Sequence, residues 1–225
     1  MKEHFKILEQ PSSIKEIAYE NIKKQIIQGN IKPGSWLREQ ELANAMEISR
    51  APIREAFNQL ERDGFIKILP RKGAKVISLS EKEVEDIFEI RETLESLAIQ
   101  KSLKNISLDK LNQIATKFER FKLESSEKTV RLEYLFLDKE FHDLLVQHCK
   151  NQMLIKLLAS IQEKVHWLRG FSLDNRSFSQ SIEEHIAIIH AIQRKNEKLV
   201  LSNLIRHLER AKESTINEIR SGKIG

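Results

Sequence analysis

Four residues of the types that bind transition metals stand where the apolar pattern predicts buried helix faces. These residues are Asp138, His142, His185 and His207. Asp138 and His142 are four residues apart, one helical turn, so both side chains can reach the same ion. A buried carboxylate needs a cation or hydrogen-bond donors. One carboxylate with three imidazoles suits a divalent ion such as Zn²⁺, the first choice here, or Ni²⁺, Mn²⁺ or Fe²⁺. Spacing alone also fits four separately hydrogen-bonded core residues.

Further charged residues are candidates for binding a small organic acid. They are Arg91, Glu95 and Arg169, with His166 near the last of these. An inward Arg91 beside a divalent ion would offer a carboxylate a bidentate anchor. The alternative is an ordinary salt bridge between Arg91 and Glu95, which are one turn apart.

Two arginines at the start of a predicted helix have the spacing of base-reading residues. Arg50 and Arg54 share an outward helix face, from which guanidinium groups can donate to guanine O6 and N7 in a major groove. Ser49 stands at the N-cap, where the side chain and the free N–H groups of the helix could meet a phosphate. The alternative is a solvated arginine pair on an ordinary surface helix.

The elements that position these arginines are three helices and a hairpin. Helices are predicted over 14–28, 39–47 and 50–63, and extended segments over 65–69 and 74–79. Pro33-Gly34 marks a turn. The hairpin tip contains Arg71, Lys72 and Gly73, which could lie along the DNA backbone or minor groove. This order predicts a winged helix-turn-helix.

From Ser80 onward the sequence predicts helix throughout. Ser80 and Glu83 have the spacing of a capping box. Helices are predicted over 81–102, 108–125, 128–148, 152–171, 180–194 and 197–221. Ser107, Asn151 and Ser179 are predicted N-caps, and 172–178 is the longest break. The boundary between two domains therefore falls near Leu79.

Composition narrows the class of protein. Only 7 Gly and 4 Pro in 225 residues indicate long helices with short connections. A single cysteine, Cys149, excludes an intramolecular disulfide framework and fits a reducing cytoplasm, where we expect the protein. No apolar run approaches a membrane span, and the N-terminus lacks the apolar core of a signal peptide. Residues 1–78 carry 14 Lys and Arg against 10 Asp and Glu, which suits a nucleic-acid surface.

Five short motifs follow one another over residues 29–76. They read G-x-I-x-P-G, L-x-E-x-E-L-A, S-R-x-P-I-R-E-A, L-x-x-x-G-F and P-x-x-G-x-x-V. The set resembles the N-terminal domain of the GntR family of transcription regulators. The resemblance implies DNA contacts by Arg38, Arg50, Arg54, Arg71, Lys72 and Gly73. Gln40 stands where the family often has a basic contact residue, and Ala51 replaces a common Thr, so the resemblance implies DNA binding but does not specify the operator sequence.

The helical part carries D-x-x-x-H at 138–142 and two later histidines, His185 and His207. This pattern resembles the FCD type of GntR effector domain, and the resemblance implies that these four residues hold a metal ion. The segment I-R-E-T-L-E around Arg91 resembles the first-helix signature of the same family, in which the arginine lies towards the pocket.

Three classes of function fit these patterns. The first is a regulator, in our prediction a repressor, that binds an inverted repeat in double-stranded DNA as a homodimer and responds to a small carboxylate at the metal. The second is a metal-dependent hydrolase or oxygenase, but the sequence has no nucleophile elbow, phosphate loop or H-E-x-x-H motif. The third is an architectural protein whose helical part only dimerises. We predict the first, without catalytic residues: a mainly α protein with a winged helix-turn-helix over 1–79 and a helical metal, effector and dimerisation domain over 80–225.

Overall fold

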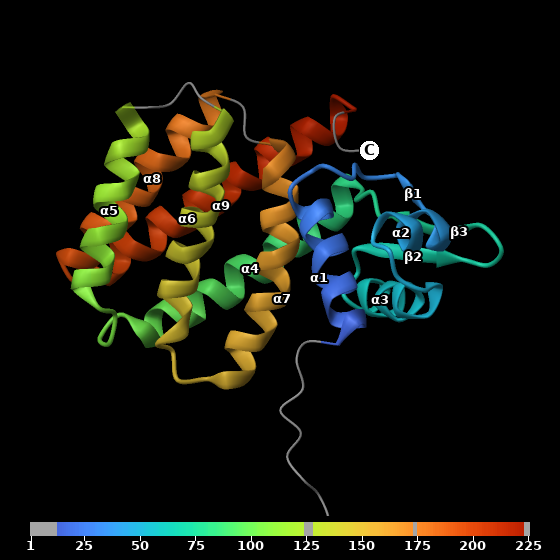
Figure 1. Cartoon of the computed structure of the whole chain (residues 1–225). Coiled ribbons are helices and arrows are strands. Elements are labelled where there is room, and N and C mark those ends of the chain that lie inside the picture. The colour runs from blue at the N-terminus through green and yellow to red at the C-terminus, as the bar shows by residue number, and fades with distance from the viewer. Residues whose placement is uncertain (1–12, 124–127, 173–174, 223–225) are drawn as a thin grey trace, which may run out of the picture. The chain divides into compact units, whose positions relative to one another are not determined.

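The computed structural model describes residues 13–123, 128–172 and 175–222, which form two compact units (Figure 1). The division falls between Ile77 and Ser78. Among the described residues, no helix is long and apolar enough to cross a membrane.

Three helices and a small sheet make up the first unit. Its elements are α1 (Ile14–Ile27), β1 (Trp36–Leu37), α2 (Glu39–Ala45), α3 (Arg50–Arg62), β2 (Ile66–Leu69) and β3 (Gly73–Val76). Helix α3 packs against α1 and α2 and buries Ile53, Phe57 and Leu60, the stripe that its spacing indicates. The predicted winged helix-turn-helix is therefore confirmed as the fold of this unit.

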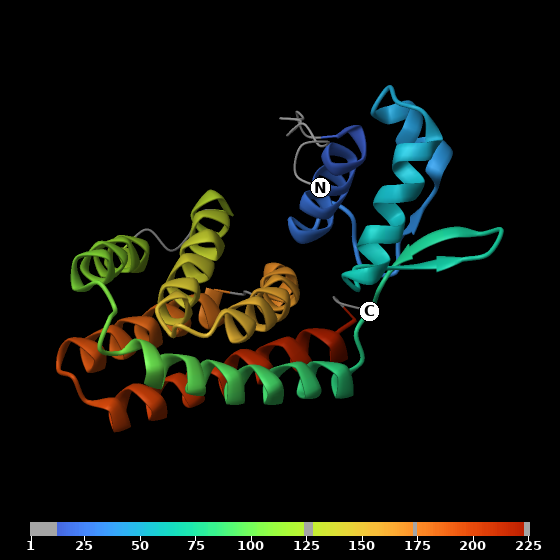
Figure 2. The same ribbon diagram turned by 90° about the horizontal axis from the view of Figure 1, so that it is seen from below.

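The sheet contains one strand that the sequence pattern does not predict. Strand β3 lies between β1 and β2 and is antiparallel to both. The amide of Gly34 donates a hydrogen bond to the carbonyl of Val76, so the predicted turn at Pro33-Gly34 brings β1 alongside β3. A strand of two residues is too short to show alternation in a sequence. Strands β2 and β3 form the hairpin that projects beyond the helices of this unit (Figure 2).

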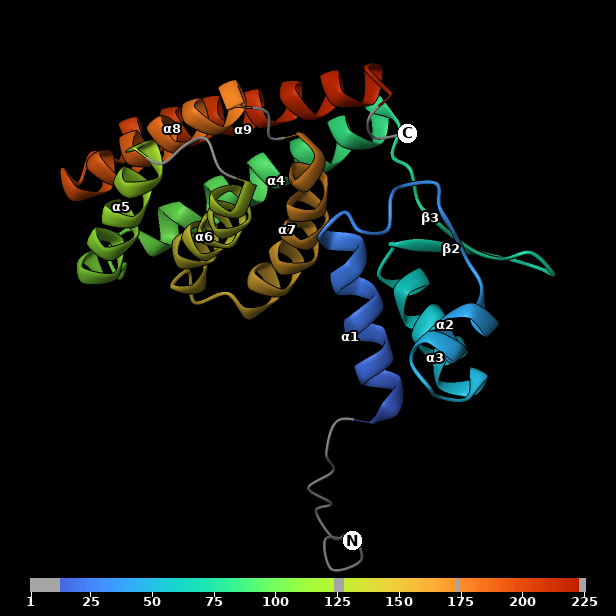
Figure 3. The same cartoon turned by 45° about the horizontal axis from the view of Figure 1, so that its top comes forward.

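The second unit is built of helices. They are α4 (Glu81–Ser102), α5 (Leu108–Leu123), α6 (Lys128–Gln147), α7 (Gln152–Ser172), α8 (Asn175–Gln193) and α9 (Glu197–Arg220). Helices α4 and α9 run side by side (Figure 2), and α5, α6 and α7 stand in a row (Figure 3). Helix α8 packs against α5 and α9. Apolar side chains from α5, α6, α8 and α9 form the main core, and three of these helices carry the predicted metal ligands.

Most of the predicted helix starts are confirmed. Ser80 and Glu83 form the capping box at the start of α4. The side chains of Ser107 and Asn151 accept hydrogen bonds from the backbone N–H groups of Lys110 and Leu154. These bonds satisfy N–H groups that have no partner within their own helix.

The predicted start of α8 is wrong. Helix α8 begins at Asn175, so Ser179 lies inside it and is no N-cap. Phe178 is fully buried in the main core one turn before Ile182, so the apolar stripe of the helix extends beyond the predicted start. Residues 173–174 of the predicted break and 124–125 of the predicted helix 108–125 lie outside the described residues.

Candidate metal centre and DNA-contact groove

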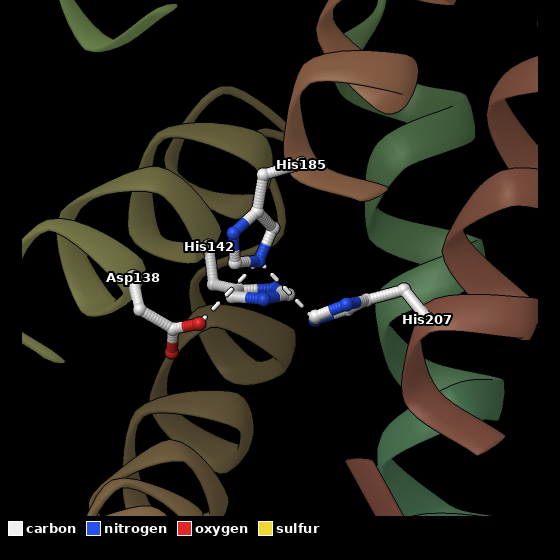
Figure 4. Close-up of side chains that lie close together, drawn as sticks. All are labelled: Asp138, His142, His185 and His207. Carbon is white, nitrogen blue, oxygen red and sulfur yellow. Dashed lines mark hydrogen bonds and ion pairs between the residues drawn. The ribbon is translucent and has the colours of Figure 1, made fainter. Parts of the chain in front are cut away.

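Three helices bring the four predicted metal ligands together. Asp138 and His142 come from α6, His185 from α8 and His207 from α9, and the side chains point toward one another (Figure 4). One ligand atom of each residue lies within 4.8 Å of the others, and all four residues are buried. Since α6, α8 and α9 belong to one core, ordinary packing of their apolar stripes brings these side chains to one point.

The imidazole nitrogens point into the cluster. Nε2 of His185 lies 3.2 Å from Nε2 of His207 and 3.4 Å from Oδ1 of Asp138. Nε2 of His142 is buried and has no hydrogen-bond partner in the described part of the chain. A buried nitrogen without a partner is costly in a folded protein. A carboxylate and three imidazoles with converging lone pairs fit a divalent transition-metal ion.

The environment favours the protonation states that metal binding needs. Burial and neighbouring cationic groups lower the pKa of His185 and of His207 well below the usual value, so both rings are neutral near pH 7. Burial alone would raise the pKa of Asp138, but the charge of the neighbouring Arg169 guanidinium outweighs it and holds the pKa far below its usual range. The cluster therefore offers an ionised carboxylate beside the neutral imidazoles of His185 and His207.

Each candidate ligand histidine has a partner for its other ring nitrogen. Nδ1 of His142 lies 2.9 Å from Oε2 of Glu95, and Nδ1 of His207 lies 3.1 Å from Oε2 of Glu184. Nδ1 of His185 lies 3.3 Å from the hydroxyl of Tyr134. The sequence does not single out Glu184 or Tyr134, because a polar residue beside a ligand shows no helical spacing that links it to a ring on another element.

The predicted effector residues lie next to this cluster. Nε of Arg91 donates to Oε1 of Glu95 at 2.6 Å, so the salt bridge considered above is present. Both side chains are buried, and Nη1 of Arg91 has no hydrogen-bond partner among the described residues. The charges and hydrogen bonds of Arg91 and His142 outweigh the effect of burial and lower the pKa of Glu95 to about 2. Glu95 also contacts His142, a candidate metal ligand. Its predicted role in effector binding does not include this contact.

Arg169 contacts the cluster through Asp138. Its Nη1 is ion-paired with Oδ1 of Asp138 at 3.1 Å, and its Nη2 donates to Oγ of Ser181 at 2.8 Å. His166 is half-buried and makes a tilted ring contact with Phe136, 6.0 Å between centroids. The structure therefore places Arg169 at the candidate metal site, whereas His166 is not among the converging ligands.

Most of the predicted DNA-contact residues surround one groove of the first unit. Arg38, Gln40, Arg50, Arg54, Arg71, Lys72 and Gly73 all line it. The groove is bounded by α2, α3 and the β2–β3 hairpin. Gly73 adopts φ +98°, and a Cβ there would lie 2.7 Å from the backbone oxygen of Leu37. Only glycine fits this close approach of β1 and β3 without a shift of the backbone.

The carboxylate of Glu39, which the sequence does not single out, is hydrogen-bonded to both Arg50 and Arg54. Glu39 Oε2 is 3.1 Å from Nη2 of Arg50 and 3.0 Å from Nη2 of Arg54, and its Oε1 accepts a further bond from Nε of Arg54. The hydrogen bond from Arg54 is the main cause that lowers the pKa of Glu39, so the carboxylate is charged near pH 7. The side chains of Arg50 and Arg54 are 55% and 61% exposed, so the two arginines are solvated and also share one carboxylate partner.

Ser49 occupies the predicted N-cap of α3 but makes no side-chain capping bond. The third residue of the helix is Pro52, which has no N–H to donate to the serine hydroxyl. The hydroxyl of Ser49 and the first N–H groups of the helix thus keep their hydrogen-bonding capacity.

Comparisons with known proteins give the same architecture. Residues 14–76 match the gntR family of bacterial regulatory proteins, and residues 86–210 match the FCD domain. The HTH-type transcriptional regulator YdhC of Bacillus subtilis is 30% identical over 207 residues, 91% of this chain and 92% of that protein. The gluconate operon transcriptional repressor of Bacillus subtilis is 28% identical over 205 residues, 88% of this chain and 83% of that protein.

Solved structures share the fold at low sequence identity. McbR/YncC of E. coli aligns with a TM-score of 0.75 at 17% identity, over 92% of this chain and 99% of its own. A Zn²⁺-bound FCD domain of another regulator aligns with a TM-score of 0.56 at 19% identity, over 64% of this chain and 99% of its own. Fold and matches together define a transcriptional regulator with a winged helix-turn-helix and a helical FCD domain. The chain belongs to the GntR family and carries an FCD domain.

Proposed function

We propose that this regulator is a metal-dependent sensor of a small organic acid. Asp138, His142, His185 and His207 bind a divalent ion, with Zn²⁺ the expected metal. The observation that carries this proposal is the convergence of four buried ligand atoms within 4.8 Å. Such an ion supplies open coordination positions for a carboxylate oxygen. Residues 1–79 then form the DNA-binding domain, and residues 80–225 the sensor and dimerisation domain.

The effector binds at the side of the cluster where buried cations lie. Arg91 offers its unpartnered Nη1 to the acid, Glu95 orients Arg91 through their ion pair, and Arg169 lies beside Asp138. Guanidinium groups bind carboxylates in a bidentate geometry, which a single lysine cannot do. Arg91 is paired with Glu95 and not with a candidate metal ligand. Its replacement should therefore weaken binding of the acid more than binding of the ion.

The DNA-binding unit reads an inverted repeat as part of a homodimer in the cytoplasm. Arg50 and Arg54 contact base edges, Ser49 meets a phosphate, and the remaining contacts come from the groove. These remaining residues are Arg38, Gln40, Arg71, Lys72 and Gly73. A twofold pair doubles the contacts of one small module. The relative named as a repressor of the gluconate operon supports repression as the direction of control.

Metal content is the first test of this function. Purified full-length protein should contain close to one divalent ion per chain, and His185→Ala and His207→Ala should each lose it. His190→Ala is the matched control, because His190 is exposed on the same helix as His185. Chelation should lower the melting temperature, since the ion links three helices. Protein that is free of metal and indifferent to chelator would exclude the site.

Effector dependence is tested by operator titration in the presence of candidate carboxylates. Metal-loaded protein should change its operator affinity when the acid is added, and chelated protein should respond far less. Arg91→Lys keeps the charge next to Glu95 but loses the planar guanidinium group. The variant should therefore bind the acid more weakly and retain the metal. If chelated and metal-loaded proteins respond equally to every carboxylate, the effector does not bind at the ion.

A further inference from the structure

Two of the candidate ligand rings are each tied to a carboxylate on another element. Glu95 of α4 faces Nδ1 of His142, and Glu184 of α8 faces Nδ1 of His207 on α9. A carboxylate accepts a hydrogen bond from an imidazole only where that nitrogen carries the proton. Nε2 of the same ring then keeps its lone pair, and this is the nitrogen that points into the cluster.

Each carboxylate is also held by an arginine on its second oxygen. Oε1 of Glu95 accepts from Nε of Arg91 at 2.6 Å, and Oε1 of Glu184 is ion-paired with Nη1 of Arg210 at 3.0 Å. In both carboxylates one oxygen contacts the arginine and the other contacts the histidine. Glu95 is hydrogen-bonded at both oxygens and therefore has little freedom to rotate, whereas Oε1 of Glu184 is held by the ion pair with Arg210 and has no hydrogen bond within the described residues.

We infer that Glu95 and Glu184 are positioning residues of the metal centre. They set the Nδ1–H tautomer and the orientation of His142 and His207, so that Nε2 of both rings is presented to the ion. The inference rests on the proposed metal site and gives Glu95 a role toward the ligands as well as toward Arg91. It also assigns roles to Glu184 and Arg210, whose positions follow no motif.

Glu184 is the better position for a test. Arg210 is 31% exposed and can be hydrated when its partner is removed, whereas loss of Glu95 would leave the buried Arg91 without a counter-charge. Glu184→Gln keeps an acceptor but removes the charge, and Glu184→Ala removes both. Glu183→Gln is the matched control, because the neighbouring Glu183 faces Lys122 at 3.6 Å and is 61% exposed.

The affinity of full-length protein for Zn²⁺ is measured by competition with a chelator of known affinity. Glu184→Ala should bind Zn²⁺ about 10–100-fold more weakly than wild type, because loss of a carboxylate that contacts a ligand histidine typically lowers metal affinity by this factor. Glu184→Gln should show a smaller loss of Zn²⁺ affinity. Glu183→Gln should bind like wild type. A purely structural Glu184 would instead lower the melting temperatures of metal-free and Zn²⁺-loaded protein equally and leave the affinity unchanged.

A second measurement needs no variant. Nitrogen-15 spectra of Zn²⁺-loaded wild type should show His142 and His207 protonated at Nδ1 and bound through Nε2. Ligation through Nδ1 in either ring would overturn the inference, as would unaltered Zn²⁺ affinity in both Glu184 variants. If wild type itself binds no Zn²⁺ or other divalent ion, the proposed metal site fails and the inference with it, so the two failures are distinguishable.

Discussion

Arg54 and Lys72 line the same groove, but their side chains suit different DNA contacts. The planar fork of Arg54 matches a base edge, whereas the flexible ammonium of Lys72 matches a phosphate. Arg54→Ala should weaken operator binding by about 1–3 kcal/mol per half-site. Lys72→Ala should weaken all sequences alike and reduce the salt slope by about one per protomer. Titrations of operator and scrambled duplexes at several salt concentrations separate the two. Normal operator binding by Arg54→Ala would exclude α3 as the reading helix.

Glu39 places a negative charge between the two base-reading candidates, so it orients them and also repels DNA. Glu39→Gln should raise affinity for any duplex by removing the charge, while the ratio of operator to scrambled affinity falls because Arg50 and Arg54 lose their common anchor. Glu55→Gln is the control, since Glu55 lies on the same helix as Arg54 but pairs with Lys15 at 3.4 Å. An unchanged ratio in Glu39→Gln would show that the carboxylate does not preorganise the arginines.

At the scale of elements, the β2–β3 hairpin is joined to β1 by the close approach of β1 and β3 at Gly73. Gly73→Ala combines a strained positive φ with a Cβ only 2.7 Å from the Leu37 carbonyl oxygen, so one of the two strands must move. We expect a loss of at least about 1–3 kcal/mol in the stability of this unit. In Gly34→Ala, φ is +77° but the nearest atom is the Lys75 side chain at 3.9 Å, so the loss should be smaller. Thermal unfolding of both variants tests the order, and equal losses would contradict it.

The candidate metal centre shows how the packing of helices brings side chains together. Asp138 and His142 need only one turn of α6, but His185 and His207 need α8 and α9 to pack at one particular register. Side chains of α8 such as Ile182 and Ile189 are fully buried in the main core, and they set that register. The same apolar contacts therefore stabilise the unit and align the ligands.

At the scale of the whole molecule, we propose that the effector alters DNA affinity through the connection between the two units. Strand β3 ends at Val76 and α4 begins at Glu81, so four residues join them. A coupling of about 1–3 kcal/mol would change operator affinity about 5–150-fold. A flexible Gly-Ser stretch inserted after Leu79 should abolish that response while leaving operator binding and metal content intact. The same stretch appended to the C-terminus is the control. A full effector response in the insertion variant would show that coupling takes another route.

Periodicity and short motifs determine much of this protein. The helices, the hairpin with its basic tip, the capping box of Ser80 and Glu83 and the identities of the four candidate ligands all follow from local patterns. Local patterns suffice there because a helix face, a cap or a tight turn involves residues within a few positions of one another. Where local information is ambiguous, as at the start of α8, the burial of Phe178 decided the boundary.

Only the tertiary structure decides which side chains meet across elements. The third strand of the sheet, the two arginines on Glu39, and the pairing of Glu184 with His207 join residues that no spacing rule connects. The convergence of four ligand atoms is of the same kind, since it depends on the packing of three helices. A sequence pattern specifies which face of a helix is buried, but the neighbour that covers this face is chosen by the shape and volume of the whole core.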